Sequence, residues 1–107
     1  MKYKIKFTEN AKQDLRDIAI YVAERSGNRE VAKRLVVELR DKCRVLEDFP
    51  ESGAIPRDRV MISGGYRFLV HGDYLLFYLN KPEENTSYVM AVFNAKRDYF
   101  RVMKKFL

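Results

Sequence analysis

The side chains able to move a proton or attack a substrate are few in this sequence. The chain of 107 residues contains one histidine and one cysteine. His71 stands in a tight turn, Gly72-Asp73 following it, and a histidine in such a turn is usually a solvated surface residue. Cys43 lies on an apolar helical stripe with no base nearby in sequence, so we expect a small core residue and not a nucleophile.

Basic residues and one tyrosine form a second group, suited to contact with an anionic partner or with a phosphate. They stand near the ends of predicted strands and in the last twelve residues. The candidates for contact with a target are Arg67, Lys96, Arg97, Tyr99, Arg101, Lys104 and Lys105.

Arg67 alternates with apolar neighbours along a predicted strand. Tyr66, Phe68 and Val70 share one face, so Arg67 occupies the other. If helices cover the first face, Arg67 points to the far side of the sheet, where the C-terminal tail also begins. The alternative is an ordinary exposed arginine, or one that pairs with a nearby acid, Asp73 or Asp98.

The charge is positive and unevenly spread. The chain has 21 Lys and Arg against 15 Asp and Glu, a net of 21 − 15 = +6. This excess favours an anionic partner, either nucleic acid or an acidic protein, with general solubility as the alternative. The tail from residue 96 combines basic and apolar positions. We expect Phe100, Met103 and Phe106 to pack on the sheet while Arg101, Lys104 and Lys105 stay exposed.

Several classes of site are disfavoured by the composition. One histidine and one cysteine cannot build a metal site, and Gly64-Gly65 precedes a strand and not a helix, so no phosphate loop is expected. We therefore expect no cofactor. A single cysteine excludes an intrachain disulfide, the first residues do not resemble a signal peptide, and no apolar run approaches the roughly 20 residues of a membrane span. These features predict a cytoplasmic protein.

Two helices are expected to follow an N-terminal strand. Residues 2–7 alternate lysine with apolar residues, a pattern typical of a half-buried strand. Thr8 can cap a helix that ends near Gly27, and Asn28 can cap a second helix from about Arg29 to Asp48. The short link makes the two helices antiparallel. On their exposed face the sequence offers acid-first i,i+4 pairs, Glu30/Arg34 and Glu38/Lys42.

The second half predicts a sheet and a terminal helix. Residues 50–65 are rich in Pro and Gly and read as a loop, with a short strand around 60–62. Strands are expected at 66–70, 74–79 and 87–93, and a short helix at 98–107. The segment 74–79 is apolar on both faces, so its strand should be central. The sequence thus predicts one α+β domain over residues 1–107: an N-terminal strand, an α-helical hairpin packed on a mainly antiparallel sheet, and a short C-terminal helix.

Five short motifs, in this order, resemble the RelE/ParE superfamily of toxins. They are Ala11-x3-Leu15-x2-Ile18-x2-Tyr21, Leu46-x2-Phe49-Pro50-x2-Gly53, Tyr66-Arg67, the run 72–78 and the run 92–98. The resemblance implies the toxin of a type II toxin–antitoxin system, which arrests growth and forms a hetero-oligomer with a cognate antitoxin encoded beside it. It implies no cofactor and no membrane.

The superfamily divides by target. Its ribonuclease-type members cut messenger RNA on the ribosome, and many carry a histidine or an equivalent polar group near the end of the last strand. This chain has Asn94 there, which cannot shuttle a proton at neutral pH. ParE-like members inhibit DNA gyrase by protein–protein contact, and the long helical hairpin favours this class. The alternative is a ribosome-dependent ribonuclease that works with Arg67, Lys96, Arg97 and Tyr99. A third possibility is an interaction module without toxic activity.

Overall fold

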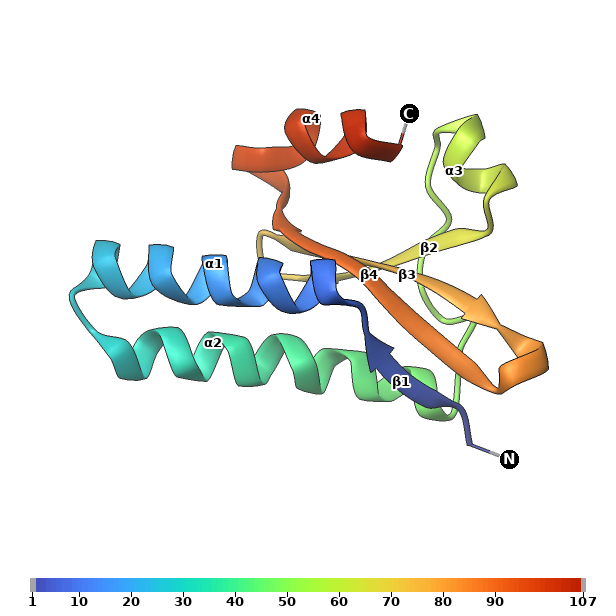
Figure 1. Cartoon of the computed structure of the whole chain (residues 1–107), viewed down its shortest axis with the longest axis horizontal. Coiled ribbons are helices and arrows are strands. Elements are labelled where there is room, and N and C mark those ends of the chain that lie inside the picture. Colours follow the sequence, from blue (N-terminus) through green and yellow to red (C-terminus); the bar gives the residue numbers. More distant parts are fainter. Residues whose placement is uncertain (1, 107) are drawn as a thin grey trace.

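A four-stranded sheet forms the centre of the domain (Figure 1). The computed structural model describes residues 2–106, apart from the side chains of Phe100, Met103, Lys105 and Phe106. The strands are β1 (Lys4–Phe7), β2 (Tyr66–His71), β3 (Tyr74–Lys81) and β4 (Thr86–Asn94), arranged in the order β1-β4-β3-β2. β1 and β4 run parallel, whereas β2–β3 and β3–β4 are antiparallel, and a 3₁₀ turn, η2 (Pro82–Glu84), joins β3 to β4. The strands predicted at 2–7, 66–70, 74–79 and 87–93 and their mainly antiparallel pairing are confirmed.

The helical hairpin consists of α1 (Glu9–Ser26) and α2 (Arg29–Lys42). Thr8 caps α1 by accepting a hydrogen bond from the backbone N–H of Ala11, and Asn28 caps α2 through two N–H groups. Gly27 adopts the left-handed conformation with φ of 67°, which reverses the chain between the helices. Local sequence chemistry therefore sets both ends of the link, as predicted.

The second helix is shorter than predicted. It does not continue to Asp48 as an α-helix, because the chain tightens into a 3₁₀ segment, η1 (Cys43–Glu47). Tightening of the last turn is common at helix ends, and here it leaves Cys43 and Leu46 buried against the sheet.

The predicted i,i+4 ion pairs are also wrong. Glu30 pairs with Lys33 at 3.7 Å and not with Arg34. Glu38 reaches across to the imidazole of His71 at 3.1 Å and not to Lys42. His71 is the last residue of β2 and remains at the surface, with 33% of its side chain exposed, but the contact with Glu38 holds its imidazole against α2. For Glu38, the tertiary contact with His71 replaces the predicted local pair with Lys42.

The segment 60–62 is helical and not a strand. It lies in α3 (Arg59–Ser63), where the Asp58 carboxylate accepts from the N–H groups of Val60 and Met61. A short apolar run is compatible with either a strand or a helix, and this cap decides for the helix. Met61 is fully buried, so α3 covers part of the sheet.

Each face of the sheet carries its own layer of helix (Figure 1). One cluster joins α1, α2 and η1 to Leu69, Leu76, Tyr78, Val89 and Val92 of the sheet. A second cluster lies on the other face. It joins Phe77, Ala91 and Phe93 of the sheet to Met61 of α3 and to Val102 of α4 (Ala95–Phe106). The expected central role of residues 74–79 is thus confirmed. None of the described helices is long and apolar enough to span a membrane.

Side chains of the first helix also bind the backbone of β4. The register of β3 and β4 shifts between Phe77 and Tyr78, a bulge-like irregularity. Near it, Asn10 donates to the carbonyl of Met90 at 3.0 Å, and Asp14 accepts from the N–H of Val92 at 2.9 Å. Both contacts satisfy backbone groups close to the irregularity, so they fix α1 on the last strand.

Leu39→Ala tests the hairpin-side core. Leu39 is 0% exposed and belongs to the cluster that joins α2 to the sheet. Its truncation should lower the free energy of unfolding by about 2–5 kcal/mol, measured by urea denaturation. The matched control is Val37→Ala on the same helix, where the side chain is 55% exposed and the loss should stay below about 1 kcal/mol. Equal losses in both variants would contradict this packing.

Candidate functional site

The last strand and the last helix meet at Asn94, the final residue of β4. Its side-chain oxygen accepts from the backbone N–H groups of Lys96 and Arg97, both at 2.9 Å. This is an N-cap, so α4 begins at Ala95, three residues earlier than predicted. Asn94 therefore positions the basic residues that follow it.

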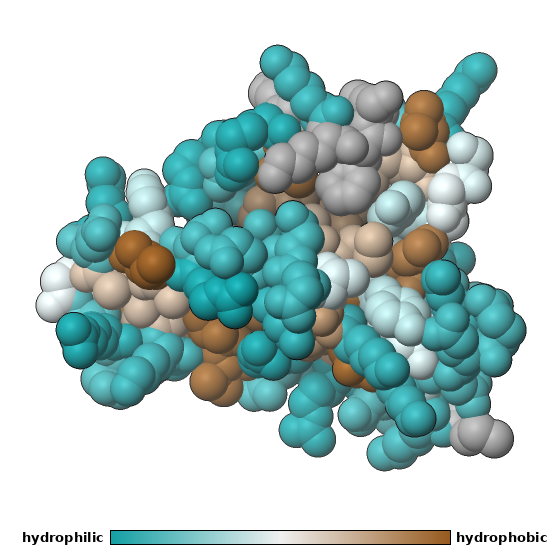
Figure 2. Space-filling view, viewed as in Figure 1, coloured by the Kyte–Doolittle hydropathy of each residue, from teal (hydrophilic) through white to brown (hydrophobic). Residues whose placement is uncertain are grey.

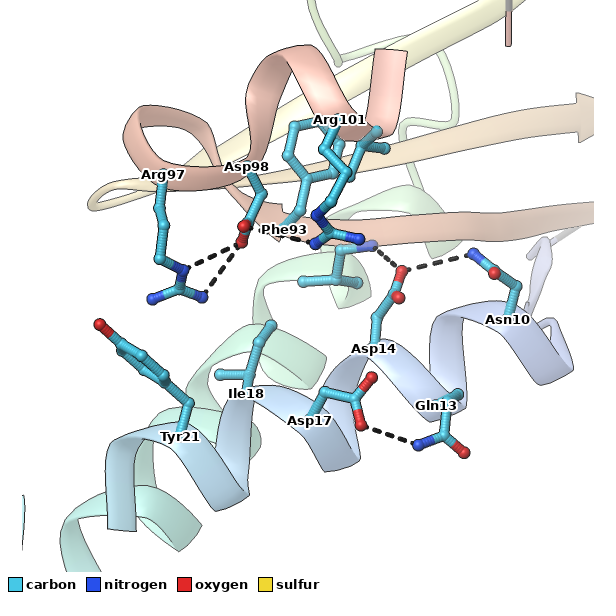
Figure 3. Close-up of a pocket in the computed structure, with 12 residues that line it drawn as sticks. Asn10, Gln13, Asp14, Asp17, Ile18, Tyr21, Phe93, Arg97, Asp98 and Arg101 are labelled. Carbon is cyan, nitrogen blue, oxygen red and sulfur yellow. Dashed lines mark hydrogen bonds and ion pairs between the residues drawn. The ribbon is translucent and has the colours of Figure 1, made fainter. Parts of the chain in front are cut away.

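A cleft of about 310 Å³ separates α4 from α1 (Figure 3). Polar side chains of α1 form one wall, and basic and acidic side chains of α4 form the other. Its lining residues are Asn10, Gln13, Asp14, Asp17, Ile18, Tyr21, Val92, Phe93, Arg97, Asp98, Arg101 and Val102. The cleft is thus the place where the predicted basic tail faces the helical hairpin.

Asp98 holds the two arginines of this cleft together. Its carboxylate receives Arg97 at 3.1 Å and Arg101 at 3.3 Å, and its side chain is 14% exposed. Because one carboxylate serves two guanidinium groups, the cluster of Asp98, Arg97 and Arg101 carries a net charge of 2 − 1 = +1, and Asp14 and Asp17 on the opposite wall bring the cleft to −1. Asp98 therefore neutralises part of the charge of Arg97 within the molecule.

Arg97 also lies over the ring of Tyr21, with 3.9 Å between the guanidinium carbon and the ring centroid. Partial burial lowers the pKa of Arg97, but the attraction of Asp98 and Tyr21 outweighs it, and the net shift is upward. Arg97 therefore stays charged at every physiological pH. It links α4 to α1 and cannot act as a general acid or base.

The carboxylates on the α1 wall are also engaged. Asp14 accepts from Val92, as described above, and Asp17 accepts from the amide of Gln13 at 2.8 Å. Among the residues that the structure describes, no group of three or more His, Cys, Asp or Glu side chains could hold a metal ion. The arrangement of the cleft suits charge-based contact with a partner better than proton transfer.

Arg67 lies on the opposite face of the sheet from the one predicted for it. It shares the hairpin side with Leu69 and His71, because Phe68 packs into the cluster under α3 and α4. Its guanidinium donates to the backbone carbonyls of Glu51 and Gly53 at 3.0 and 3.2 Å. The suggested pairing of Arg67 with Asp73 or Asp98 is also wrong, because Asp73 pairs with Lys96 and Asp98 with Arg97 and Arg101. Arg67 binds a loop and does not join the other candidates.

The remaining candidates are spread around α4. Lys96 pairs with Asp73 at 3.4 Å, and both side chains are largely exposed. Tyr99 faces away from the cleft, toward a separate pocket lined by Ile55 and Phe68, and is 40% exposed. Lys104 is exposed.

The rest of the tail is only partly described. Lys105 lies outside the described side chains, as do Phe100, Met103 and Phe106, whose packing was predicted. The described residue that fixes α4 on the sheet is Val102, which is 7% exposed.

Cys43 is a core residue, as predicted. It is 1% exposed, and burial raises the pKa of its thiol to about 12, although Arg40 opposes the shift. A thiol with such a pKa is almost wholly protonated at neutral pH and is a poor nucleophile.

The hairpin carries a second candidate surface, which we call the basic groove. It is a hollow of about 190 Å³ between α1 and α2, and its residues are Lys12, Leu15, Arg16, Ala19, Val36 and Arg40. Figure 2 shows apolar side chains exposed between the two helices among hydrophilic ones. An apolar floor with cationic borders suits an amphipathic segment that carries negative charge.

Sequence reasoning missed Tyr21, Asp98 and the basic groove as parts of a site. Tyr21 follows Asp14 and Asp17 by seven and four residues, the spacing of one helix face, so a polar stripe beside the apolar one was a usable signal. Asp98 stands next to Arg97 and three residues before Arg101, the spacing that pairs side chains on a helix.

The chain is similar to known proteins both in sequence and in fold. Residues 5–99 match the family described as the ParE toxin of the type II toxin–antitoxin system, parDE. No curated protein matches the chain. A chain in the structure of the chromosomal ParDE TA system from P. aeruginosa is similar, with a TM-score of 0.71, 19% identity, and coverage of 87% of this chain and 96% of that one.

Two further structures share the fold. The RelBE2 toxin–antitoxin complex from Mycobacterium tuberculosis gives a TM-score of 0.59 at 20% identity, covering 88% of this chain and 92% of that one. The isolated RelE toxin of E. coli gives 0.51 at 22% identity, covering 98% and 99%. At these identities the likeness extends to the fold alone.

Proposed function

The chain belongs to the ParE toxin family of type II toxin–antitoxin systems, and we propose that it arrests growth in the cytoplasm by inhibiting DNA gyrase through protein–protein contact. The observation that carries this choice is the separation of Arg67 from Arg97. Arg67 binds the loop carbonyls of Glu51 and Gly53, whereas Arg97 lies in the cleft between α1 and α4, where it contacts Tyr21 and Asp98.

Cleavage of RNA through its own 2′-hydroxyl needs a base, an acid and a cation aimed at one phosphate. The described candidates are not arranged in this way. His71 is bound to Glu38 on the hairpin side, Asn94 caps α4, and Tyr99 lies on the side of α4 away from the cleft. Dispersed cations of this kind suit docking, in which several contacts share the binding free energy.

The neutralising partner is an antitoxin, by analogy with the toxin–antitoxin complexes that share the fold. We assign its docking to the basic groove, because an acidic amphipathic segment could place apolar side chains over Leu15, Ala19 and Val36. The bordering cations would attract the segment before contact, and the net charge of +6 supports the same attraction at longer range. The complex is thus a hetero-oligomer whose partner folds on the toxin.

Purified protein should inhibit DNA supercoiling by gyrase, and substitutions in α4 should weaken inhibition by degrees. Arg97→Ala should raise the concentration for half-inhibition about three- to tenfold, because one of several docking contacts is lost. Removing Arg101, Lys104 and Lys105 together should raise the half-inhibitory concentration further. Arg34 on α2 is exposed and gives a charge-matched control, Arg34→Ala, which should change the half-inhibitory concentration less than about twofold.

Two results would contradict this proposal. Supercoiling that continues unchanged in a molar excess of folded protein would exclude gyrase as the target. Complete loss of inhibition in Arg97→Ala, with unchanged melting temperature, would show that one group dominates and that the contact is not dispersed.

Binding of the antitoxin should be salt-dependent. Raising NaCl from about 0.05 to 0.5 M should weaken the affinity at least about tenfold, because the borders of the basic groove are screened. Arg16→Gln combined with Arg40→Gln should flatten this dependence, measured by titration calorimetry of the toxin with the product of the neighbouring gene. An affinity independent of salt would exclude electrostatic docking at this surface.

A further inference from the structure

The turn after the helical hairpin exposes a large aromatic side chain. Phe49 is 65% exposed, and Val45, one turn earlier, is 40% exposed. The two are neighbours, since the N–H of Phe49 bonds to the carbonyl of Val45 at 2.9 Å. Together they form an apolar patch, here called the Phe49 knob, beside a shallow depression lined by residues 48–52.

The backbone behind the Phe49 knob is held by buried polar side chains. Tyr78, only 1% exposed, donates to the carbonyl of Pro50 at 2.8 Å and accepts from the N–H of Gly53 at 2.9 Å. Asn80 donates to the same carbonyl of Pro50 at 2.8 Å, and the fully buried Ser87 fixes Asn80 by donating to its side-chain oxygen.

The far end of the turn is fixed equally firmly. Arg67 binds the carbonyls of Glu51 and Gly53, as described above. A β-carbon on Gly53 would lie 2.6 Å from the Tyr78 ring and 2.9 Å from the carbonyl oxygen of Phe68, so only glycine fits there. The turn is therefore rigid, and its side chains are presented in fixed directions.

None of these contacts uses the side chain of Phe49. The fold needs the backbone of the turn, but it gains little from an aromatic ring in water at this position. A rigid segment loses little conformational freedom on binding, and large aromatic side chains dominate the energetics of many interfaces. The arrangement thus has the properties of a preorganised docking element.

The surroundings of the Phe49 knob are weakly acidic in a basic chain. Three carboxylates, Glu47, Asp48 and Glu51, stand against two nearby cations, Arg44 in the sequence and Arg67 at the carbonyl of Glu51, a net of 2 − 3 = −1, while the whole chain carries +6. A complementary surface is therefore apolar at its centre and bordered by Lys and Arg. Proteins that handle DNA carry such basic borders, because they neutralise phosphates.

We propose that the Phe49 knob inserts into an apolar pocket with basic borders on the toxin's target enzyme, as a second contact besides α4. The inference rests on the proposed function, since it names the target as a DNA-handling enzyme. The basic groove is then left to the antitoxin, while the Phe49 knob and α4 contact two different regions of the target.

The test is direct binding of the folded toxin to purified, DNA-free gyrase by biolayer interferometry. Phe49→Ala should raise the dissociation constant at least about tenfold, as for the loss of an interface hot spot. Ile20→Ala is the matched control: Ile20 is 57% exposed on the outside of α1, and its truncation should change the constant less than about twofold. The double variant Asp48→Asn and Glu51→Gln should weaken binding about threefold and reduce its dependence on salt.

If the wild type binds gyrase and Phe49→Ala binds with the same affinity, this inference is overturned and the proposed function stands. Absence of wild-type binding would overturn both, because no gyrase contact would exist. An equal loss in Phe49→Ala and Ile20→Ala would also overturn it, since any exposed apolar side chain would then serve. Melting temperatures within about 2 °C of the wild type confirm that the variants are folded.

Discussion

The domain depends on a pair of central strands that are apolar on both faces. In β3, Leu76 and Tyr78 face the helical hairpin while Phe77 faces the opposite side, and all three are almost fully buried. Such strands must be covered twice, since each exposed face would leave large apolar side chains in water. The hairpin covers one face, and α3 with α4 covers the other (Figure 1). A short tail therefore becomes a structural layer, and it carries five of the 21 Lys and Arg residues of the chain.

This double cover decides what the basic residues can do together. Arg67 in β2 binds the loop that follows η1, whereas Arg97 at the start of α4 is held in the cleft between α1 and α4. Asp98 and Tyr21 take up much of the charge and direction of Arg97 inside the molecule. What remains outside is a set of surfaces with different charge: basic along the hairpin groove and on α4, acidic around Phe49. Separate docking surfaces follow more naturally from this layout than one catalytic centre does.

The sequence predicted the elements well, because their signals are local. Alternation marked the strands, and Thr8, Gly27 and Asn28 carried their own cap and turn chemistry. It failed where a tertiary contact decided the outcome. Alternation put Arg67 on the face opposite Tyr66, but it could not tell which face the hairpin covers. The cleft between α1 and α4 was equally hidden, since Tyr21 and Arg97 are far apart in sequence and meet only when both layers are in place.

The central claim is that this toxin acts by contact and does not cut RNA. The most direct measurement is a cleavage assay. Folded toxin is added to ribosomes that translate an end-labelled message of defined sequence, and the RNA is then resolved on a sequencing gel. The account predicts an intact message at toxin concentrations that stop supercoiling, because Arg67, His71, Arg97 and Tyr99 lie in different surroundings and do not converge on one site. Fragments ending at codon boundaries, absent without toxin, would contradict it.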